Sequence, residues 1–320
     1  MVENLSENNA KASQLTTDCQ HPTYRNTAPN LEPILGKAFP VLDHGFVRVV
    51  DYMGDDGSIV QAARVSYGTG TRKVREDRGL IRYLLRHRHT TPFEMCEIKF
   101  HIKLPIFVAR QWIRHRTANV NEHSARYSVL DQEFYVPDRA QMAIQSAQNR
   151  QGRGALISDD TAEVYRETLR NNAETAFTSY QQMIAGAEED TEPNGLTREL
   201  ARIGLPVSTY TQWYWKIDLH NLFHFLKLRL DPHAQYEIRV YAETMATIVE
   251  QWVPMAYEAF RDYSLHAATL SRMEVVALQS LLEGSPPAWE SWGLSPREVR
   301  EFCERFQLDP TTGRRIGEVK

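Results

Sequence analysis

The residues from Glu97 to Arg116, EIKFHIKLPIFVARQWIRHR, decide the fold. In the first half, apolar residues alternate with charged or imidazole side chains, which predicts a strand with one buried face; the apolar set is Ile98, Phe100, Ile102 and Leu104. Pro105 is typical of a helix start. On a helical wheel, Val108 and Trp112 fall on the apolar side, and the polar side collects Arg110, Gln111, Arg114 and His115. We expect a strand followed by a helix with several hydrogen-bonding groups on one side.

This helix opens a segment rich in arginine, which continues to Tyr127 and contains Arg110, Arg114, Arg116 and Arg126. Four guanidiniums so close together repel one another and resist burial. An anion that the free chain lacks is their simplest partner. The segment therefore predicts a phosphate-binding site.

The composition is that of an ordinary globular protein, with 320 residues, 42% hydrophobic and 24% charged. The formal net charge of −4 argues against a protein that coats nucleic acid. Three separated cysteines, Cys19, Cys96 and Cys303, favour a reducing compartment over a disulfide framework. We find no signal peptide and no apolar run long enough to span a bilayer, so we expect a cytoplasmic protein.

Helical patterns dominate the rest of the chain, and the expected class is α+β. We expect a mobile polar extension over residues 1–37, a main domain over 38–265, and a C-terminal extension over 266–320 with a helix near 296–306. Capping boxes are predicted at Thr91–Glu94 and Ser295–Glu298. The other expected elements are a strand at 46–52, a surface loop at 141–160, and helices at 58–67, 78–88, 160–187, 198–203, 218–229 and 234–263.

Two arginines outside the dense segment have both a structural and a functional interpretation. On the helical wheel of 218–229, Arg229 falls among apolar residues, so its guanidinium needs a partner. That partner is either a substrate or a structural carboxylate from Asp218, Asp231 or Glu237. Arg202, flanked by apolar residues before Pro206, leaves the same two alternatives.

His220 and His224 are four residues apart, a spacing that can grip zinc, and His87 with His89 forms a second pair. No third ligand accompanies either pair at a recognised spacing, so ordinary polar-face histidines are favoured over a metal site. The chain also lacks a phosphate-binding loop and a dinucleotide fingerprint.

The dense segment resembles the signature of flavin-dependent thymidylate synthases, through Arg114-His115-Arg116, Asn121-Glu122 and Ser124-x-Arg126-Tyr127. The resemblance extends from about Val41 to Tyr263 and includes Ala62–Ser66, Thr91–Glu94, Ala201–Pro206 and Leu226–Arg229. It implies a helix-rich subunit with a small, mostly antiparallel sheet, assembled as a homotetramer whose active sites are shared between subunits. It also implies methylation of dUMP to dTMP, with 5,10-methylenetetrahydrofolate as carbon donor and NADPH-reduced FAD as hydride source.

The resemblance also implies which residues form the site. Residues expected to bind dUMP are Gln111, Arg114, Ser124, Arg126, Arg202 and Arg229, of which Arg229 and Ser124 are the catalytic candidates. Residues expected to bind FAD are Ser66, Thr91, Glu94, Arg114, His115, Arg116, Glu122, Asp218, His220 and His224. His89 is expected at the folate channel, and no metal is expected.

The residue types suit a reaction without a covalent enzyme adduct. No cysteine has a paired base, whereas a buried Arg229 can favour the N3-deprotonated uracil and so raise electron density at C5. The chain departs from the family pattern at Asn119, at Ala125, where we expect negative φ, and at Asp218 and His220. The rival hypothesis is a nucleic-acid-binding module that uses the arginine clusters.

Overall fold

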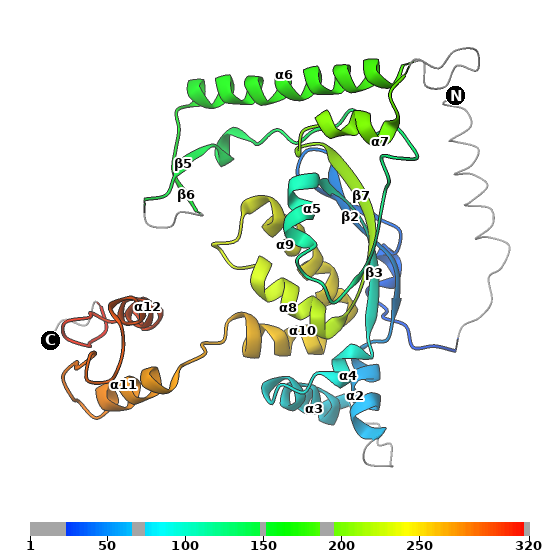
Figure 1. Cartoon of the computed structure of the whole chain (residues 1–320). Helices are drawn as coiled ribbons and strands as arrows, with labels where there is room; N and C mark the ends of the chain where they lie inside the picture. Colours follow the sequence, from blue (N-terminus) through cyan, green and yellow to red (C-terminus); the bar gives the residue numbers. More distant parts are fainter. Residues whose placement is uncertain (1–23, 66–73, 148–151, 186–194, 317–320) are drawn as a thin grey trace. The chain divides into compact units, whose positions relative to one another are not determined.

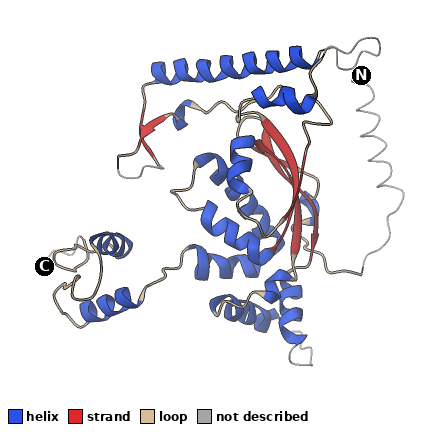
Figure 2. Cartoon of the chain, viewed as in Figure 1, coloured by secondary structure: helices blue, strands red, loops and turns tan. Residues whose placement is uncertain are grey.

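The computed structural model describes residues 24–65, 74–147, 152–185 and 195–316 (Figure 1). The chain divides into two compact units, Met1–Leu265 and His266–Lys320. The first unit combines many helices with an antiparallel five-stranded sheet, which confirms the α+β class (Figure 2). No helix in the described ranges has both the length and the apolar character needed to cross a membrane.

The sheet has the order β1-β2-β3-β7-β4, and its strands are β1 (Ala38–Val41), β2 (Gly45–Met53), β3 (Glu97–Pro105), β7 (Tyr210–Asp218) and β4 (Asn119–Glu122). The predicted strands at 46–52 and 98–104 are confirmed as β2 and β3. Sequence reasoning missed β7, although its buried Trp213, Trp215 and Ile217 alternate with more exposed residues at period two. It also missed β4, a short strand whose residues are all exposed.

Helices α5 (Ile106–Trp112), α8 (Leu219–Arg229) and α9 (Tyr236–Trp252) cover one face of the sheet (Figure 1). Trp112 is fully buried and stacks on Phe225 of α8, with ring centroids 4.6 Å apart. It also makes a T-shaped contact with Trp215 of β7, with ring centroids 5.2 Å apart. The predicted helix at 218–229 is confirmed as α8. The expectation that Arg114 and His115 continue the Pro105 helix is wrong, because α5 ends at Trp112 and a turn leads into β4.

Helices α2 (Asp56–Arg64), α3 (Val74–Arg86) and α4 (Thr91–Glu94) lie together at one end of the sheet (Figure 1). The short helical turn predicted at Thr91 is present as α4. Its predicted capping box is wrong, because the N-cap is Thr90 and its side chain makes no capping hydrogen bond. Just after α3, Arg88 has φ of 58°, a left-handed conformation that costs a side chain roughly 1 kcal/mol.

The remaining helices of this unit are α6 (Asp159–Ile184), α7 (Arg198–Ala201), η4 (Arg202–Gly204), α10 (Pro254–Phe260) and the π-helix η5 (Arg261–Leu265). The helix predicted at 234–263 is interrupted at Val253, because Pro254 disfavours the helical conformation for the residue before it. The surface loop predicted at 141–160 is wrong in part. The helix η3 (Arg139–Gln141) ends at its first residue, and the segment contains a hairpin of β5 (Ala143–Gln145) and β6 (Arg153–Leu156).

The start of the fold lies earlier in the chain than Ala38. Leu31 is fully buried beside the short helix η1 (Glu32–Ile34), and the N–H of Ala28 donates to the Tyr52 hydroxyl at 2.8 Å. The boundary predicted for the polar extension, residue 37, is therefore too late, because apolar side chains in its last part join the core.

The second unit contains α11 (Arg272–Leu282) and α12 (Pro296–Phe306). The capping box predicted at Ser295 and Glu298 is present, and a second one forms at Ser271 and Glu274. Its small core gathers Ala277, Leu294, Phe302 and Cys303, with Trp289 and Trp292 packed against them.

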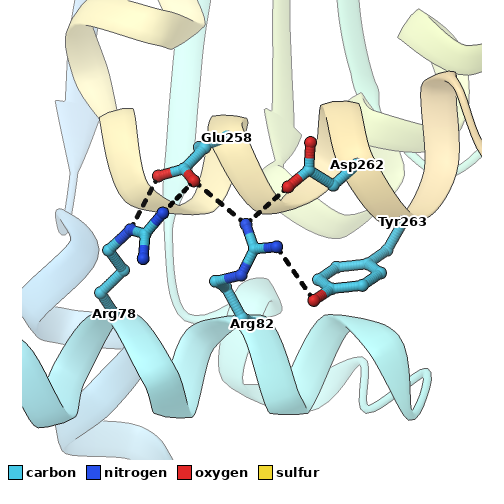
Figure 3. A network of polar contacts seen from close by, with 5 residues as sticks. All are labelled: Arg78, Arg82, Glu258, Asp262 and Tyr263. Carbon is cyan, nitrogen blue, oxygen red and sulfur yellow. Dashed lines mark hydrogen bonds and ion pairs between the residues drawn. The ribbon is translucent and has the colours of Figure 1, made fainter.

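An ionic network attaches α3 to α10 and η5 (Figure 3). Arg78 donates to both carboxylate oxygens of Glu258. Arg82 donates to Asp262 at 2.7 Å, to Glu258 at 3.1 Å and to the Tyr263 hydroxyl at 3.0 Å. The π-helical turn presents Asp262 and Tyr263 to the same guanidinium, so Arg82 joins the two helices at several points.

We predict that Arg82→Gln and Asp262→Asn each lower the free energy of unfolding by about 1 kcal/mol, with a coupling of about 0.5 kcal/mol, because Arg82 is partly shielded from solvent. Chemical denaturation of both single variants and the double variant measures the coupling. Arg139→Gln, which removes a more exposed pair with Glu163, is the control and should change stability less. If the losses of unfolding free energy in the two single variants simply add in the double variant, Arg82 and Asp262 do not stabilise the fold through their contact.

Candidate active site

A pocket of about 360 Å³ lies where β7 meets α8, and we call it the Arg229 pocket. Its lining residues are Arg114, His115, Arg116, Thr117, Ile217, Asn221, His224, Leu228 and Arg229. Five of the residues predicted to bind dUMP or FAD therefore meet here, although they come from segments on either side of β4 and β7. The turn after α5 supplies the Arg114–Arg116 side, and the last turns of α8 supply the Arg229 side.

His115 and Arg229 are in direct contact in this pocket. The Arg229 Nε–H donates to Nε2 of His115 at 3.1 Å, so the imidazole is neutral and carries its proton on Nδ1. Burial, with added repulsion from the positive charge of Arg229, lowers the pKa of His115 to about 4. Burial also lowers the pKa of the Arg229 guanidinium.

None of the three pocket guanidiniums forms an ion pair with a carboxylate in the described ranges. The structural partners considered for Arg229 are engaged elsewhere: Asp218 accepts from Asn221, Asp231 contacts His233, and Glu237 pairs with Arg153. That alternative for Arg229 is therefore wrong. Arg229 is half-buried, whereas Arg114 and Arg116 are exposed. Three neighbouring guanidiniums without a carboxylate partner favour an anionic ligand.

A second pocket of about 330 Å³ lies at the other end of β4, and we call it the Ser124 pocket. Its lining residues are Ile106, Glu122, His123, Ser124, Ala125, Leu130, Arg202, Leu205 and Thr211. Glu122 accepts from the Thr211 hydroxyl at 2.8 Å, and the Ser124 hydroxyl accepts from the N–H of Arg126. The Arg126 side chain forms an exposed ion pair with Glu199 of α7 at 3.0 Å. A free anion would have to displace Glu199 to engage this guanidinium.

The two pockets are held apart by the sheet. Thr211 lines one pocket and Ile217 lines the other, and these residues lie six steps apart along extended strand β7, which separates their Cα atoms by roughly 20 Å. Strand β4, paired with β7 between Asn119 and Glu122, carries the chain from one pocket to the other. The residues predicted to bind dUMP are therefore divided in a single chain, with Ser124 and Arg202 in one pocket and Arg114 and Arg229 in the other.

The other predicted residues have varied surroundings. Gln111 of α5 has a buried Oε1 without a hydrogen-bond partner among the described residues, and it lines neither of the two pockets. Asp218 caps α8, with both carboxylate oxygens accepting from Asn221. Ala125 is not among the described residues with positive φ, as predicted. The remaining residues predicted for FAD or folate line neither pocket. His220 lies on the first turn of α8, Thr91 and Glu94 lie on α4, and His89 follows α3. Ser66 falls outside the described residues.

Sequence reasoning missed several pocket residues, namely Thr117, His123, Thr211 and Asn221. Thr211 could have been found from the alternation that marks β7. The other three are adjacent to predicted residues or one helical turn from them, but have no chemistry that sets them apart. A larger cavity, about 700 Å³, is lined partly by α6 and contains none of the predicted site residues.

The described cysteines are free thiols, and neither lines the two pockets. Cys96 is fully buried, and burial raises the pKa of its thiol to about 12. A thiolate at this position is therefore strongly disfavoured at neutral pH. Within the described ranges, no group of three or more potential metal ligands is present.

Comparison with known proteins assigns the family. The family profile described as "Thymidylate synthase complementing protein" matches residues 48–255. The flavin-dependent thymidylate synthase of Ruegeria pomeroyi is 60% identical over 281 residues, which cover 88% of this chain and 92% of that protein. The chain belongs to the flavin-dependent thymidylate synthase family. Within this family, the enzyme of Rickettsia conorii is 54% identical and covers 89% of this chain and 98% of its own.

A solved structure agrees with the assignment. The UMP/dUMP methylase PolB from Streptomyces cacaoi, bound with 5-Br dUMP, is 34% identical and has a TM-score of 0.63. The match covers 71% of this chain and 99% of the methylase. The family resemblance inferred from the arginine-rich signature is thus confirmed.

We predict that His115 makes folding sensitive to acid. The unfolded imidazole takes up a proton near pH 6.5, whereas the folded one resists protonation until about pH 4, so stability falls as pH drops through this interval. His115→Gln keeps an acceptor for Arg229 but cannot titrate. Between about pH 7 and pH 4.5, the melting temperature of the natural protein should fall more than that of the variant. If the melting temperatures of the two proteins fall equally with pH, His115 is not held neutral in the folded state.

Proposed function

We propose that this chain methylates C5 of the uracil ring of dUMP to give dTMP. The proposed carbon donor is 5,10-methylenetetrahydrofolate, and the proposed reductant is NADPH acting through FAD. Membership of the flavin-dependent thymidylate synthase family supports the reaction class. The observation that carries the proposal is the Arg229 pocket, which is lined by three arginines without a described carboxylate partner and by a neutral histidine that accepts from Arg229.

The donor set of the Arg229 pocket fits FAD. A dinucleotide cofactor has a pyrophosphate that needs cations, and Arg114 and Arg116 supply them in a chain without a dinucleotide fingerprint. His224, whose ring lies 6.2 Å from that of His115, adds a donor on the other wall. We propose that these residues hold FAD, together with Ser66, Thr91, Glu94, Glu122, Asp218 and His220. The chemistry that a bound FAD supplies is hydride transfer.

We propose that dUMP is held by Gln111, Arg114, Ser124, Arg126, Arg202 and Arg229. Ser124 and Arg202 share one pocket, and Arg114 and Arg229 share the other. Because one chain keeps these pockets roughly 20 Å apart, a complete site needs residues from more than one copy. This division supports active sites shared between copies, and we propose that the assembly is the homotetramer implied by the family resemblance. Free thiols at Cys96 and Cys303 are in keeping with a cytoplasmic location.

Arg229 provides the activation of the base in this proposal. Its guanidinium is half-buried, and His115 fixes its orientation by accepting from Nε, which leaves the terminal N–H groups free to face a ligand. A positive charge in a partly desolvated pocket stabilises negative charge on the pyrimidine and so raises electron density at C5. Ser124, Arg126 and Arg202 anchor the phosphate, while His89 is proposed to contact the folate. No thiolate is required, in agreement with the burial of Cys96.

Flavin binding tests the function most simply. Purified protein, or protein incubated with FAD, should show the visible absorbance of a flavoprotein. Under anaerobic conditions with NADPH and the folate donor, it should convert dUMP to dTMP. A protein that stays colourless with added FAD, yet binds RNA or DNA through its arginines, would support the rival nucleic-acid-binding hypothesis and overturn this one.

We predict that Arg229→Lys lowers kcat by about 100-fold and raises the KM for dUMP by less than about tenfold. The ammonium keeps the charge but lacks the planar fork that His115 orients. Steady-state kinetics on FAD-loaded protein measures both constants. Arg139→Lys, far along the chain in an exposed pair with Glu163, is the matched control and should leave them unchanged. Normal turnover of Arg229→Lys would exclude the proposed role.

A further inference from the structure

The C-terminal end of α3 presents a cluster of basic residues, Arg86, His87, Arg88 and His89, which we call the α3 basic end. All four side chains are exposed. Two earlier arginines of this helix, Arg78 and Arg82, are neutralised by carboxylates of α10 and η5 (Figure 3). By contrast, neither Arg86 nor Arg88 pairs with a carboxylate in the described ranges. The network thus holds the helix in place, and two positive charges at its end remain unneutralised.

The helix dipole favours a cation in the last turn, such as Arg86, but hydrogen-bonded capping does not require the side chain of Arg88. The N–H of His89 donates to the Leu84 carbonyl at 2.9 Å, and the N–H of Arg88 donates to the Leu85 carbonyl at 3.1 Å. This pattern is a Schellman motif, in which the main chain itself satisfies the last carbonyls. The motif favours glycine at the residue with positive φ, and here that residue is Arg88, with φ of 58°. A strained arginine that the helix end does not require points to a function for its side chain.

Aromatic rings extend the cluster. Tyr83, whose side chain is 49% exposed, has its ring 4.3 Å from the ring of His87 and 6.1 Å from the ring of His89. The tyrosine limits the positions of both imidazoles and gives the α3 basic end a flat, partly apolar side. Guanidiniums beside such a surface suit an extended anionic ligand, since each guanidinium can bind a carboxylate or phosphate through two hydrogen bonds.

We infer that the α3 basic end binds the multiply charged anionic tail of a co-substrate. This inference rests on the proposed function, which supplies two such tails: the glutamyl carboxylates of the folate donor and the phosphates of NADPH. His89 belongs to the cluster and is also the residue predicted at the folate channel. Arg86 and Arg88 would raise affinity for the tail without touching the reacting atoms.

The test compares the double variant Arg86→Gln/Arg88→Gly with the natural protein. The KM and the equilibrium dissociation constant are measured for monoglutamyl and pentaglutamyl folate donors, and for NADPH and NADH. One of the multiply charged ligands should bind about tenfold more weakly, because charge-assisted hydrogen bonds are lost. Its less charged counterpart should change less than about twofold, and kcat at saturation should be preserved.

Two further variants show whether weaker binding results from the lost charge or from a loss of stability. Arg88→Gly alone should melt at the same temperature as the natural protein or higher, because glycine relieves the positive φ. Arg88→Lys should retain most of the affinity for the tail, because it keeps the charge. Both variants are measured in the same buffers as the natural protein. The difference in affinity for the tail between the natural protein and the double variant should shrink at high salt.

The pattern of results assigns the ligand. Selective loss for the pentaglutamyl donor identifies a carboxylate site, and loss for NADPH but not NADH identifies a site for its extra phosphate. Unchanged constants for all four ligands, or equal losses for all four, would overturn the inference. If the natural protein fails to turn over dUMP with the monoglutamyl donor, the proposed function fails instead, and the two failures are therefore distinguishable.

Discussion

Strand β7 is the element on which the rest of the structure depends. Its buried Trp215 meets the edge of Trp112 from α5, and Trp112 stacks in turn on Phe225 from α8. These rings are fully buried, and aromatic pairs of this kind add specific geometry to the apolar area that they bury. The packing holds α5 against α8, and so it brings His115, which follows Trp112 in the chain, against Arg229 in the next turn of α8 after Phe225. The contact between His115 and Arg229 in the pocket therefore depends on the packing of Trp112 against Phe225 and Trp215.

Strand β7 also keeps the Ser124 pocket and the Arg229 pocket apart. One end of β7 contributes Thr211 to the Ser124 pocket, and the other end contributes Ile217 to the Arg229 pocket. A strand is stiff, so no small adjustment of one chain brings Ser124 and Arg229 to the same nucleotide. Each pocket contains only part of the set of residues proposed to bind dUMP, so we propose that neither pocket of one chain is a complete site. The arginine-rich signature is continuous in sequence but divided in space, because β4 lies in its middle.

The features that could be predicted from sequence were those with a local cause. The alternation of β3, the length of α6 and the capping box at Ser295 and Glu298 depend on neighbouring residues. The position of Arg229 among apolar residues of α8 correctly indicated a half-buried guanidinium. The missed features depend on distant contacts. Strand β4 has no apolar face and exists because β7 pairs with it, and α5 ends at Trp112 because the chain must turn toward that pairing. The Ser124 and Arg229 pockets could not be separated without knowing this register.

The central claim is that Ser124 of one copy and Arg229 of another complete a single site. Co-expressing Ser124→Ala and Arg229→Ala chains with different tags, and purifying through both tags, isolates mixed assemblies of two inactive variants. If sites are shared between copies, random mixing leaves about one quarter of the sites with both natural residues, and a similar fraction of activity returns. If all site residues came from one chain, every site would retain one substitution, and the mixed assemblies would be as inactive as either variant alone.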